Sequence, residues 1–122
     1  MLPKVFKTLY QGEPAILEFS FSSDPLTQYG HALSDVTNNS LCFKTQSVDA
    51  DNAVMQRTDG VVDTVNHKIT YQLAPSDTSG LASGMYHVVC ALKVPAFSDY
   101  IEVVTPAKYD FRVNLLSDWH AS

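Results

Sequence analysis

Basic residues are scarce in this chain of 122 residues, and long apolar runs are absent. Eight Lys and Arg stand against 13 Asp and Glu, which gives a formal net charge of −5, and no two basic residues are adjacent. A nucleic-acid-binding surface needs a stripe of basic side chains to neutralise phosphates, so we expect no nucleic-acid partner. No apolar run reaches the roughly 18–20 residues of a membrane helix, and the N-terminus has no apolar signal segment, so we expect no membrane partner and no secretion.

Residue patterns that support catalysis or metal binding are missing as well. The two cysteines, Cys42 and Cys90, are too few for a disulfide scaffold or for a zinc site of their own. Both lie among apolar neighbours, which predicts small buried side chains and reduced thiols, although the sequence leaves open a pairing across a sandwich. The four histidines lack metal-site spacing, and the five glycines form no phosphate loop. With no nucleophile elbow either, we expect no enzyme, no catalytic residues, no metal and no cofactor.

The chain instead shows apolar and polar residues alternating with a period of two, which predicts β-strands. The alternation is clearest in four segments, and β-branched and aromatic content predicts five weaker strands. Many short strands separated by turn residues predict one all-β domain, an immunoglobulin-like antiparallel β-sandwich. The four clear segments are 17–22, 68–73, 86–92 and 109–115, and the weaker ones are 5–10, 41–46, 53–56, 61–65 and 100–104.

The connections have their own signals. One short helical turn is expected near residues 75–81, where small polar residues follow a proline. Residues 22–39 are rich in Ser, Asp, Asn, Gly and Pro and are expected to form a long loop. Asp59-Gly60 predicts a hairpin turn. We place the sandwich at residues 1–114 and a C-terminal tail at residues 115–122.

Most aromatic residues fall on the apolar phase of a strand, which predicts a place in the core. Tyr29, in the long loop, and Trp119, in the tail, do not. Aromatic side chains outside a core are frequent anchors at protein interfaces. We therefore expect partner contacts at Tyr29 and His31 in the loop and at Leu116, Trp119 and His120 in the tail. The aromatic residues expected in the core are Phe19, Phe21, Phe43, Tyr71, Tyr86 and Phe111.

Residues 68–86 have a distinctive layout. A strand leads into a polar turn with Asp77-Thr78, and Leu81, Gly84 and a second strand beginning with Tyr86 follow. We expect the turn to cross between two sheets, Leu81 to close one end of the sandwich, and Tyr86 to pack inside. With the opening Tyr10-Gln11-Gly12-Glu13 and the closing strand around 109–113, this layout resembles the small immunoglobulin-like β-sandwich domains of tailed-phage virion proteins, such as the N-terminal domain of baseplate upper proteins.

The resemblance implies a non-enzymatic structural protein of a bacteriophage particle, made in the host cytoplasm and assembled into the virion. Its partners would be other virion structural proteins and further copies of itself. The leading expectation is an adaptor in the tail, the baseplate or the fibre attachment, and the alternative is a capsid decoration (cement) protein. A further alternative is a carbohydrate-binding β-sandwich module with Tyr29, Tyr100 and Trp119 as stacking residues. A charged fraction of only 17% suits permanent contact with other proteins.

Overall fold

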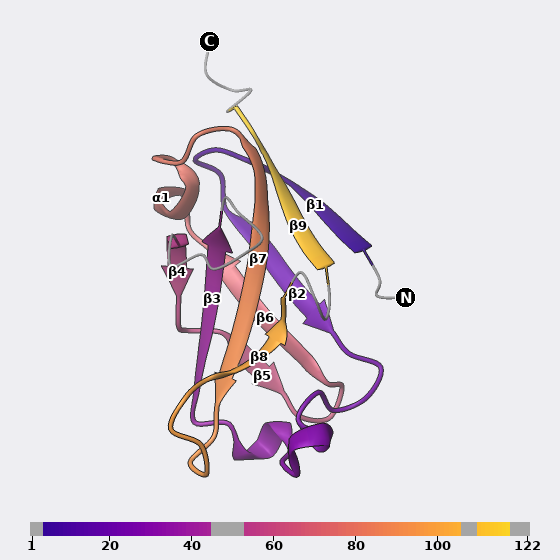
Figure 1. The fold of residues 1–122 in the computed structure, drawn as a ribbon. Helices are drawn as coiled ribbons and strands as arrows, with labels where there is room; N and C mark the ends of the chain where they lie inside the picture. Colours follow the sequence, from indigo (N-terminus) through magenta and orange to yellow (C-terminus); the bar gives the residue numbers. More distant parts are fainter. Residues whose placement is uncertain (1–3, 45–52, 106–109, 118–122) are drawn as a thin grey trace.

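The computed structural model describes residues 4–44, 53–105 and 110–117, which form two β-sheets packed face to face (Figure 1). The strands are β1 (Lys4–Tyr10), β2 (Ala15–Ser20), β3 (Asn38–Lys44), β4 (Ala53–Arg57), β5 (Val61–Asp63), β6 (Lys68–Leu73), β7 (Gly84–Lys93), β8 (Ile101–Val104) and β9 (Asp110–Leu116). Six strands form one sheet in the order β1-β9-β7-β3-β4, with β8 also paired to β7, and the other sheet has the order β2-β6-β5. The predicted all-β sandwich is confirmed, and each predicted strand has a counterpart among the described residues.

The six-stranded sheet is mixed, because β1 runs parallel to β9 while the other strand pairs are antiparallel. Parallel neighbours need a long connection, and here the rest of the sandwich supplies it. Leu9 on β1 lies in register with Leu115 on β9, and both side chains are buried. Strand β9 ends at Leu116, so the sandwich extends two residues past the boundary expected at residue 114, because the alternation of inward-facing residues continues through Leu115.

The core contains the inward-facing side chains of both sheets. Phe19 and Tyr71 meet edge to face within the three-stranded sheet, with ring centroids 6.3 Å apart. Phe43 and Tyr86 stack within the six-stranded sheet, with centroids 6.1 Å apart. These four aromatic side chains are at most 5% exposed, as predicted. Phe21 is partly buried against the core, and the side chain of Phe111 lies outside the described part of the chain.

A single helical turn, α1 (Pro75–Thr78), carries the chain from β6 in one sheet to β7 in the other (Figure 1). The Asp77 carboxylate accepts a hydrogen bond of 2.7 Å from the Ala74 backbone N–H and so caps the turn. The buried Thr78 hydroxyl accepts a hydrogen bond of 3.0 Å from the Gly12 N–H, which ties the turn to the β1–β2 connection. The predicted helical turn and its crossing between sheets are therefore confirmed.

The segment after α1 also has the predicted packing. Leu81 lies partly buried against the core, and Tyr86 is buried with its hydroxyl donating to the Ala82 carbonyl. A tyrosine bonded to backbone a few residues upstream is a recurring corner of immunoglobulin-like sandwiches. Gly84, the first residue of β7, adopts a φ of 144°, a backbone conformation that residues other than glycine rarely adopt.

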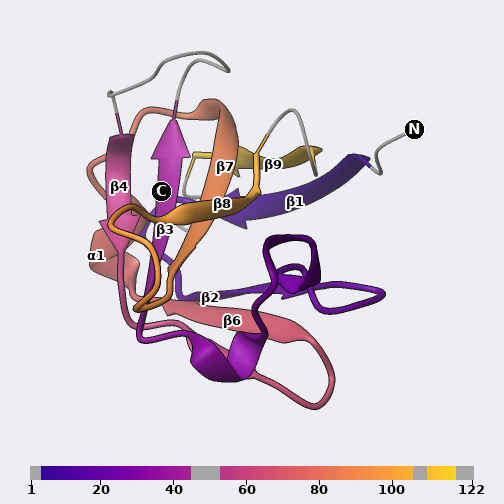
Figure 2. The same ribbon diagram turned by 60° about the horizontal axis from the view of Figure 1, so that its bottom comes forward.

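The expected long loop contains two 3-10 turns, Thr27–Tyr29 and Leu33–Asp35, before β3 begins at Asn38. The Asp24 carboxylate accepts backbone hydrogen bonds from Leu26 and Leu33, at 2.9 and 2.8 Å. Both leucine side chains are buried, so the segment covers one end of the sandwich (Figure 2). Across the described residues, α1 and the two 3-10 turns are all too short to span a membrane as helices.

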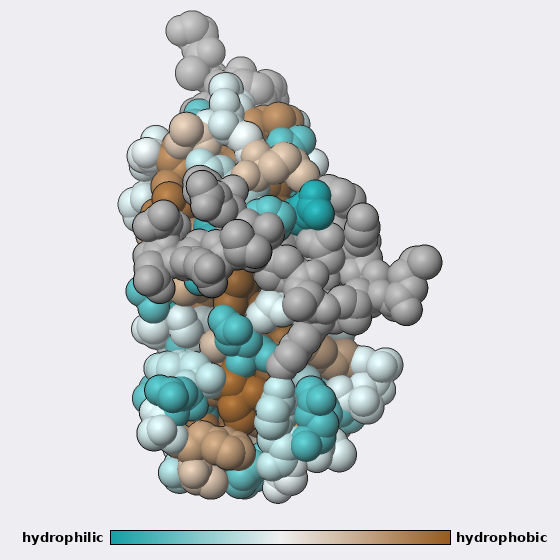
Figure 3. Space-filling view, viewed as in Figure 1, coloured by the Kyte–Doolittle hydropathy of each residue, from teal (hydrophilic) through white to brown (hydrophobic). Residues whose placement is uncertain are grey.

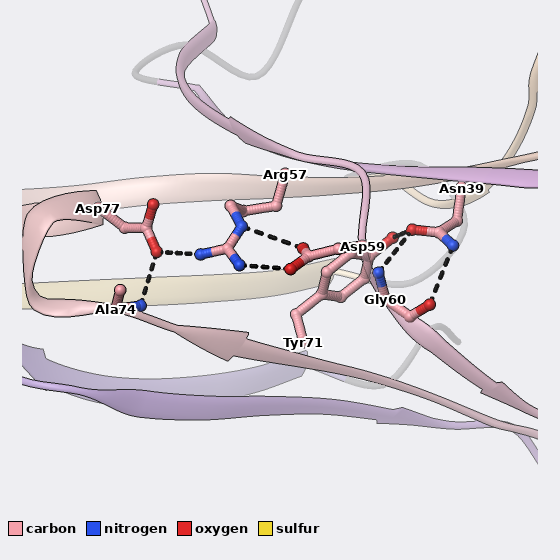
Figure 4. A network of polar contacts seen from close by, with 7 residues as sticks. All are labelled: Asn39, Arg57, Asp59, Gly60, Tyr71, Ala74 and Asp77. Carbon is pink, nitrogen blue, oxygen red and sulfur yellow. Dashed lines mark hydrogen bonds and ion pairs between the residues drawn. The ribbon is translucent and has the colours of Figure 1, made fainter.

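The connection from β4 to β5 crosses between the sheets, so the hairpin predicted at Asp59-Gly60 is wrong. Asn39 on β3 holds this crossing in place (Figure 4). Its side-chain amide donates to the Gly60 carbonyl (3.1 Å), and its carbonyl oxygen accepts from the Gly60 N–H (2.9 Å) and the Tyr71 hydroxyl (2.7 Å). A turn-forming dipeptide sets the local bend, but these long-range contacts set which sheet the next strand joins.

An ion-pair network continues from this crossing to α1 (Figure 4). The Arg57 Nε donates to an Asp59 carboxylate oxygen at 3.0 Å, and the same guanidinium pairs with Asp77. Hydrogen bonds from Arg57 hold the pKa of Asp59 below its usual value. Arg57, at the end of β4, therefore links the two segments that cross between the sheets, the β4–β5 connection and α1.

Replacing Gly60 with alanine is expected to lower the free energy of unfolding by about 1–3 kcal/mol, because the added carbon overpacks a buried contact. A Cβ at Gly60 would lie 2.6 Å from the Tyr71 ring, which cannot retreat without losing its bond to Asn39. Gly80→Ala is the matched control, since a Cβ there meets no atom within 4 Å. Urea unfolding followed by circular dichroism measures both variants, and equal losses would contradict the packing argument.

Candidate functional site

A groove of about 640 Å³ crosses the outer face of the six-stranded sheet. Its floor consists of outward-facing side chains of the central strands, Cys42 on β3 and Val89 and Ala91 on β7. Tyr29 and the residues that connect β7 to β8 form its walls. Figure 3 looks onto this face, and hydrophobic residues occupy a hollow in its lower part with hydrophilic residues on both sides. We call this feature the sheet groove.

The wall between β7 and β8 is held by its own hydrogen bonds. The Lys93 ammonium donates to the carbonyls of Val94 (3.1 Å) and Phe97, and the Phe97 N–H donates to the Val94 carbonyl at 3.2 Å. The His31 ring meets the Phe97 ring edge to face at a centroid distance of 5.2 Å. Phe97 and Tyr100 nevertheless stay 37% and 44% exposed. These aromatic surfaces are positioned before any ligand arrives, which reduces the entropy lost on binding.

Polar groups complete the lining. Gln56 and Ser40 lie beside the floor, with the glutamine amide donating to the serine hydroxyl at 3.3 Å. Asp99 and Glu102 contribute carboxylates, and Lys44 contributes an ammonium group, the one of its kind among the lining residues that the structure describes. The groove therefore combines aromatic surfaces, a small apolar floor and hydrogen-bonding groups of both kinds, a composition typical of sites for small polar ligands.

Two residues singled out from the sequence line this groove, and a third contacts its wall. Tyr29 lines it, and His31 contacts the Phe97 ring and has its Nδ1 3.6 Å from the Asp35 carboxylate. Tyr100 lines it too and directly precedes β8, which begins one residue later than the strand expected from residue 100. Sequence reasoning missed Phe97, although an aromatic residue within the polar stretch after Pro95 is a signal of the same kind as Tyr29.

Leu116 lies on a different part of the same face. It is 36% exposed and in register with Tyr10 of β1, which is equally exposed. Met85 on β7 is 45% exposed and pairs with Asn114 on β9. Leu116 follows Asn114 by two residues on β9, so Met85 and Leu116 lie on the same face of the sheet. We call Tyr10, Met85 and Leu116 the end patch. The other two tail residues expected at an interface, Trp119 and His120, lie outside the described residues.

The two cysteines occupy opposite faces of one sheet. Leu41 pairs with Cys90 and Cys42 pairs with Val89 on neighbouring strands, so Cys90 faces the core while Cys42 faces the groove. Both are free, and the approach across the sandwich that the sequence left open is wrong. Burial raises the pKa of Cys90 to about 12, which keeps its thiol protonated and poorly nucleophilic near neutral pH.

Within the described ranges, no group of three or more His, Cys, Asp or Glu is arranged to hold a metal ion. A scan against protein-family models finds no match to the chain, and a search of curated proteins finds none either. The resemblance to phage virion domains therefore depends on the sequence layout alone, and the groove and the end patch are the surface features that bear on function.

Proposed function

We propose that this chain is a non-enzymatic structural protein of a tailed-phage particle, an adaptor in the tail, the baseplate or the fibre attachment. The observation that carries the proposal is the end patch, where Tyr10, Met85 and Leu116 expose apolar surface on one face of a sheet. Clustered apolar surface of this kind marks protein-protein contacts. The patch also includes Leu116, which the sequence singled out as a partner contact.

The edge of the sheet beside the patch supports the same role. Strand β1 pairs with β9 and is one of the outer strands of the six-stranded sheet in the described structure. An outer strand offers backbone N–H and C=O groups to a strand of a neighbouring subunit, while apolar side chains beside it add burial. The partners would be other virion structural proteins or a further copy of this chain.

Mass spectrometry of purified particles, with heads separated from tails, tests the location. Recovery with tails supports the adaptor, and recovery with heads makes the chain a capsid decoration protein instead. Absence from both fractions would overturn the virion role.

A paired substitution then tests the end patch. Particles assembled with Tyr10→Ser and Leu116→Ser together should incorporate the chain about tenfold less, because an interface loses central apolar contacts. Both residues are about a third exposed in the isolated chain, so the fold should survive. Phe97→Ala with Tyr100→Ala is the matched control, since it removes exposed aromatic surface elsewhere and should leave incorporation unchanged. Equal incorporation of all three proteins would contradict the assignment of the end patch.

A further inference from the structure

We propose that the sheet groove binds a neutral saccharide, a function separate from the contact made by the end patch. The groove is the described surface where exposed aromatic rings, carboxylates and an amide converge around an apolar floor. Its volume of about 640 Å³ lies within the roughly 300–1,000 Å³ of small-molecule sites.

The floor excludes recognition by strand addition. Strand β3 lies between β7 and β4, and β7 is paired on one side with β3 and on the other with β8 and β9. Cys42 and Ala91 on the floor therefore each have a paired strand on both sides. An extended peptide gains most of its affinity from main-chain hydrogen bonds at a free edge, which this floor does not offer. A ligand here must be recognised through side chains.

The walls suit the face of a sugar ring. Aromatic rings carry negative charge on their faces, and the C–H groups on one face of a pyranose present positive charge to them. Phe97 and Tyr100 are substantially exposed, and Tyr29 lines the same groove. The contact with His31 and the hydrogen bonds from Lys93 hold the Phe97 segment in place. A rigid, exposed aromatic surface is what stacking on a sugar requires.

The polar groups suit hydroxyls and disfavour anions. Sugar hydroxyls donate strong hydrogen bonds to carboxylates such as those of Asp99 and Glu102, and the Gln56 amide both donates and accepts. Among the described lining residues two carboxylates accompany one ammonium group, that of Lys44, and together with the net charge of −5 this lining disfavours sulfated or phosphorylated sugars. The same charge opposes a second copy of this acidic chain as the occupant. A neutral saccharide satisfies both the stacking surface and the acidic lining.

The test is an NMR titration of the ¹⁵N-labelled full chain with maltotriose, cellotriose, chitotriose and mannotriose, and with a sulfated trisaccharide for comparison. At least one neutral trisaccharide, at up to about 10 mM so that even millimolar affinity is detected, should shift backbone signals of Val89, Ala91 and Tyr100. The signals of the end patch should not move.

Matched variants decide whether the groove is responsible. Phe97→Ala with Tyr100→Ala should weaken binding at least about tenfold, while Tyr10→Ser with Leu116→Ser should bind as the unmodified chain does. An unchanged urea midpoint shows that the groove variant is folded, and Tyr100→Ala alone replaces it if the midpoint falls. Absence of shifts with every neutral saccharide, binding of the sulfated one alone, or equal binding by the groove variant would overturn the proposal. Shifts of the groove signals on addition of a neighbouring virion protein, and not of a saccharide, would overturn it too. The incorporation experiment tests the end patch and does not depend on this outcome.

Discussion

Replacing Asn39 with alanine is expected to lower the free energy of unfolding by about 3–5 kcal/mol, since each buried polar group left without a partner costs about 1–3 kcal/mol. Three groups depend on this side chain: the Gly60 N–H, the Gly60 carbonyl and the Tyr71 hydroxyl. Asn39 is only 8% exposed, and Tyr71 is 1% exposed, so water cannot readily replace the lost bonds. The loss also frees the segment that carries the chain from one sheet to the other.

Asn38→Ala is the matched control for this prediction. Asn38 precedes Asn39 on β3 and is exposed, so its truncation should change stability by no more than about 0.5 kcal/mol. Urea unfolding monitored by circular dichroism measures both variants under identical conditions. If the two variants lose the same stability, the hydrogen bonds at the Gly60 crossing do not contribute as the geometry indicates.

The strands could be predicted from sequence because their signal is local. Leu17 and Phe19 are separated by the polar Glu18, and such a period of two has one structural solution when one face is buried. The pairing of strands could not be predicted in the same way. Asp59-Gly60 has the composition of a hairpin, yet the partner of β5 is decided by Asn39, which lies 21 residues from Gly60 in the sequence.

The candidate site was predictable only in part, for the same reason. Tyr29 and His31 attract attention as an aromatic residue and a histidine in an irregular segment. That they meet Phe97 and Tyr100 depends on how the segment between β7 and β8 folds back over the outer face of the sheet. The hydrogen bonds from Lys93 that hold this segment have no sequence signature. Sequence thus indicates which residues lack a place in the core, but tertiary structure decides which of them meet.

The stability of the fold is expected to fall steeply above pH 9, because the core holds two acidic protons that the unfolded chain releases. Burial raises the pKa of Cys90 from its ordinary 9.0 to about 12. Between these values the unfolded state binds fewer protons than the folded state, so unfolding becomes easier by about 1.4 kcal/mol for each pH unit. Burial and the neighbouring Cys90 also raise the pKa of Tyr71 above its ordinary 10.0, so the loss should steepen above that pH. Below pH 9 neither group contributes a slope, since both are protonated in both states.

Two variants separate the contributions of these groups. Cys90→Ala leaves a small cavity and lowers stability at all pH values. It should remove the loss of stability that begins near pH 9 and keep the contribution of Tyr71, which begins near pH 10. Tyr71→Phe should do the reverse. The free energy of unfolding in urea, measured under reducing conditions from neutral pH to about pH 11, reports each slope. Curves that stay parallel to that of the unmodified chain would show that these buried groups do not govern alkaline stability. Loss of each slope in its own variant would show that the core residues joining β6 to β7, and not the ion pair of Arg57 with the exposed Asp59, set the upper pH limit of the fold.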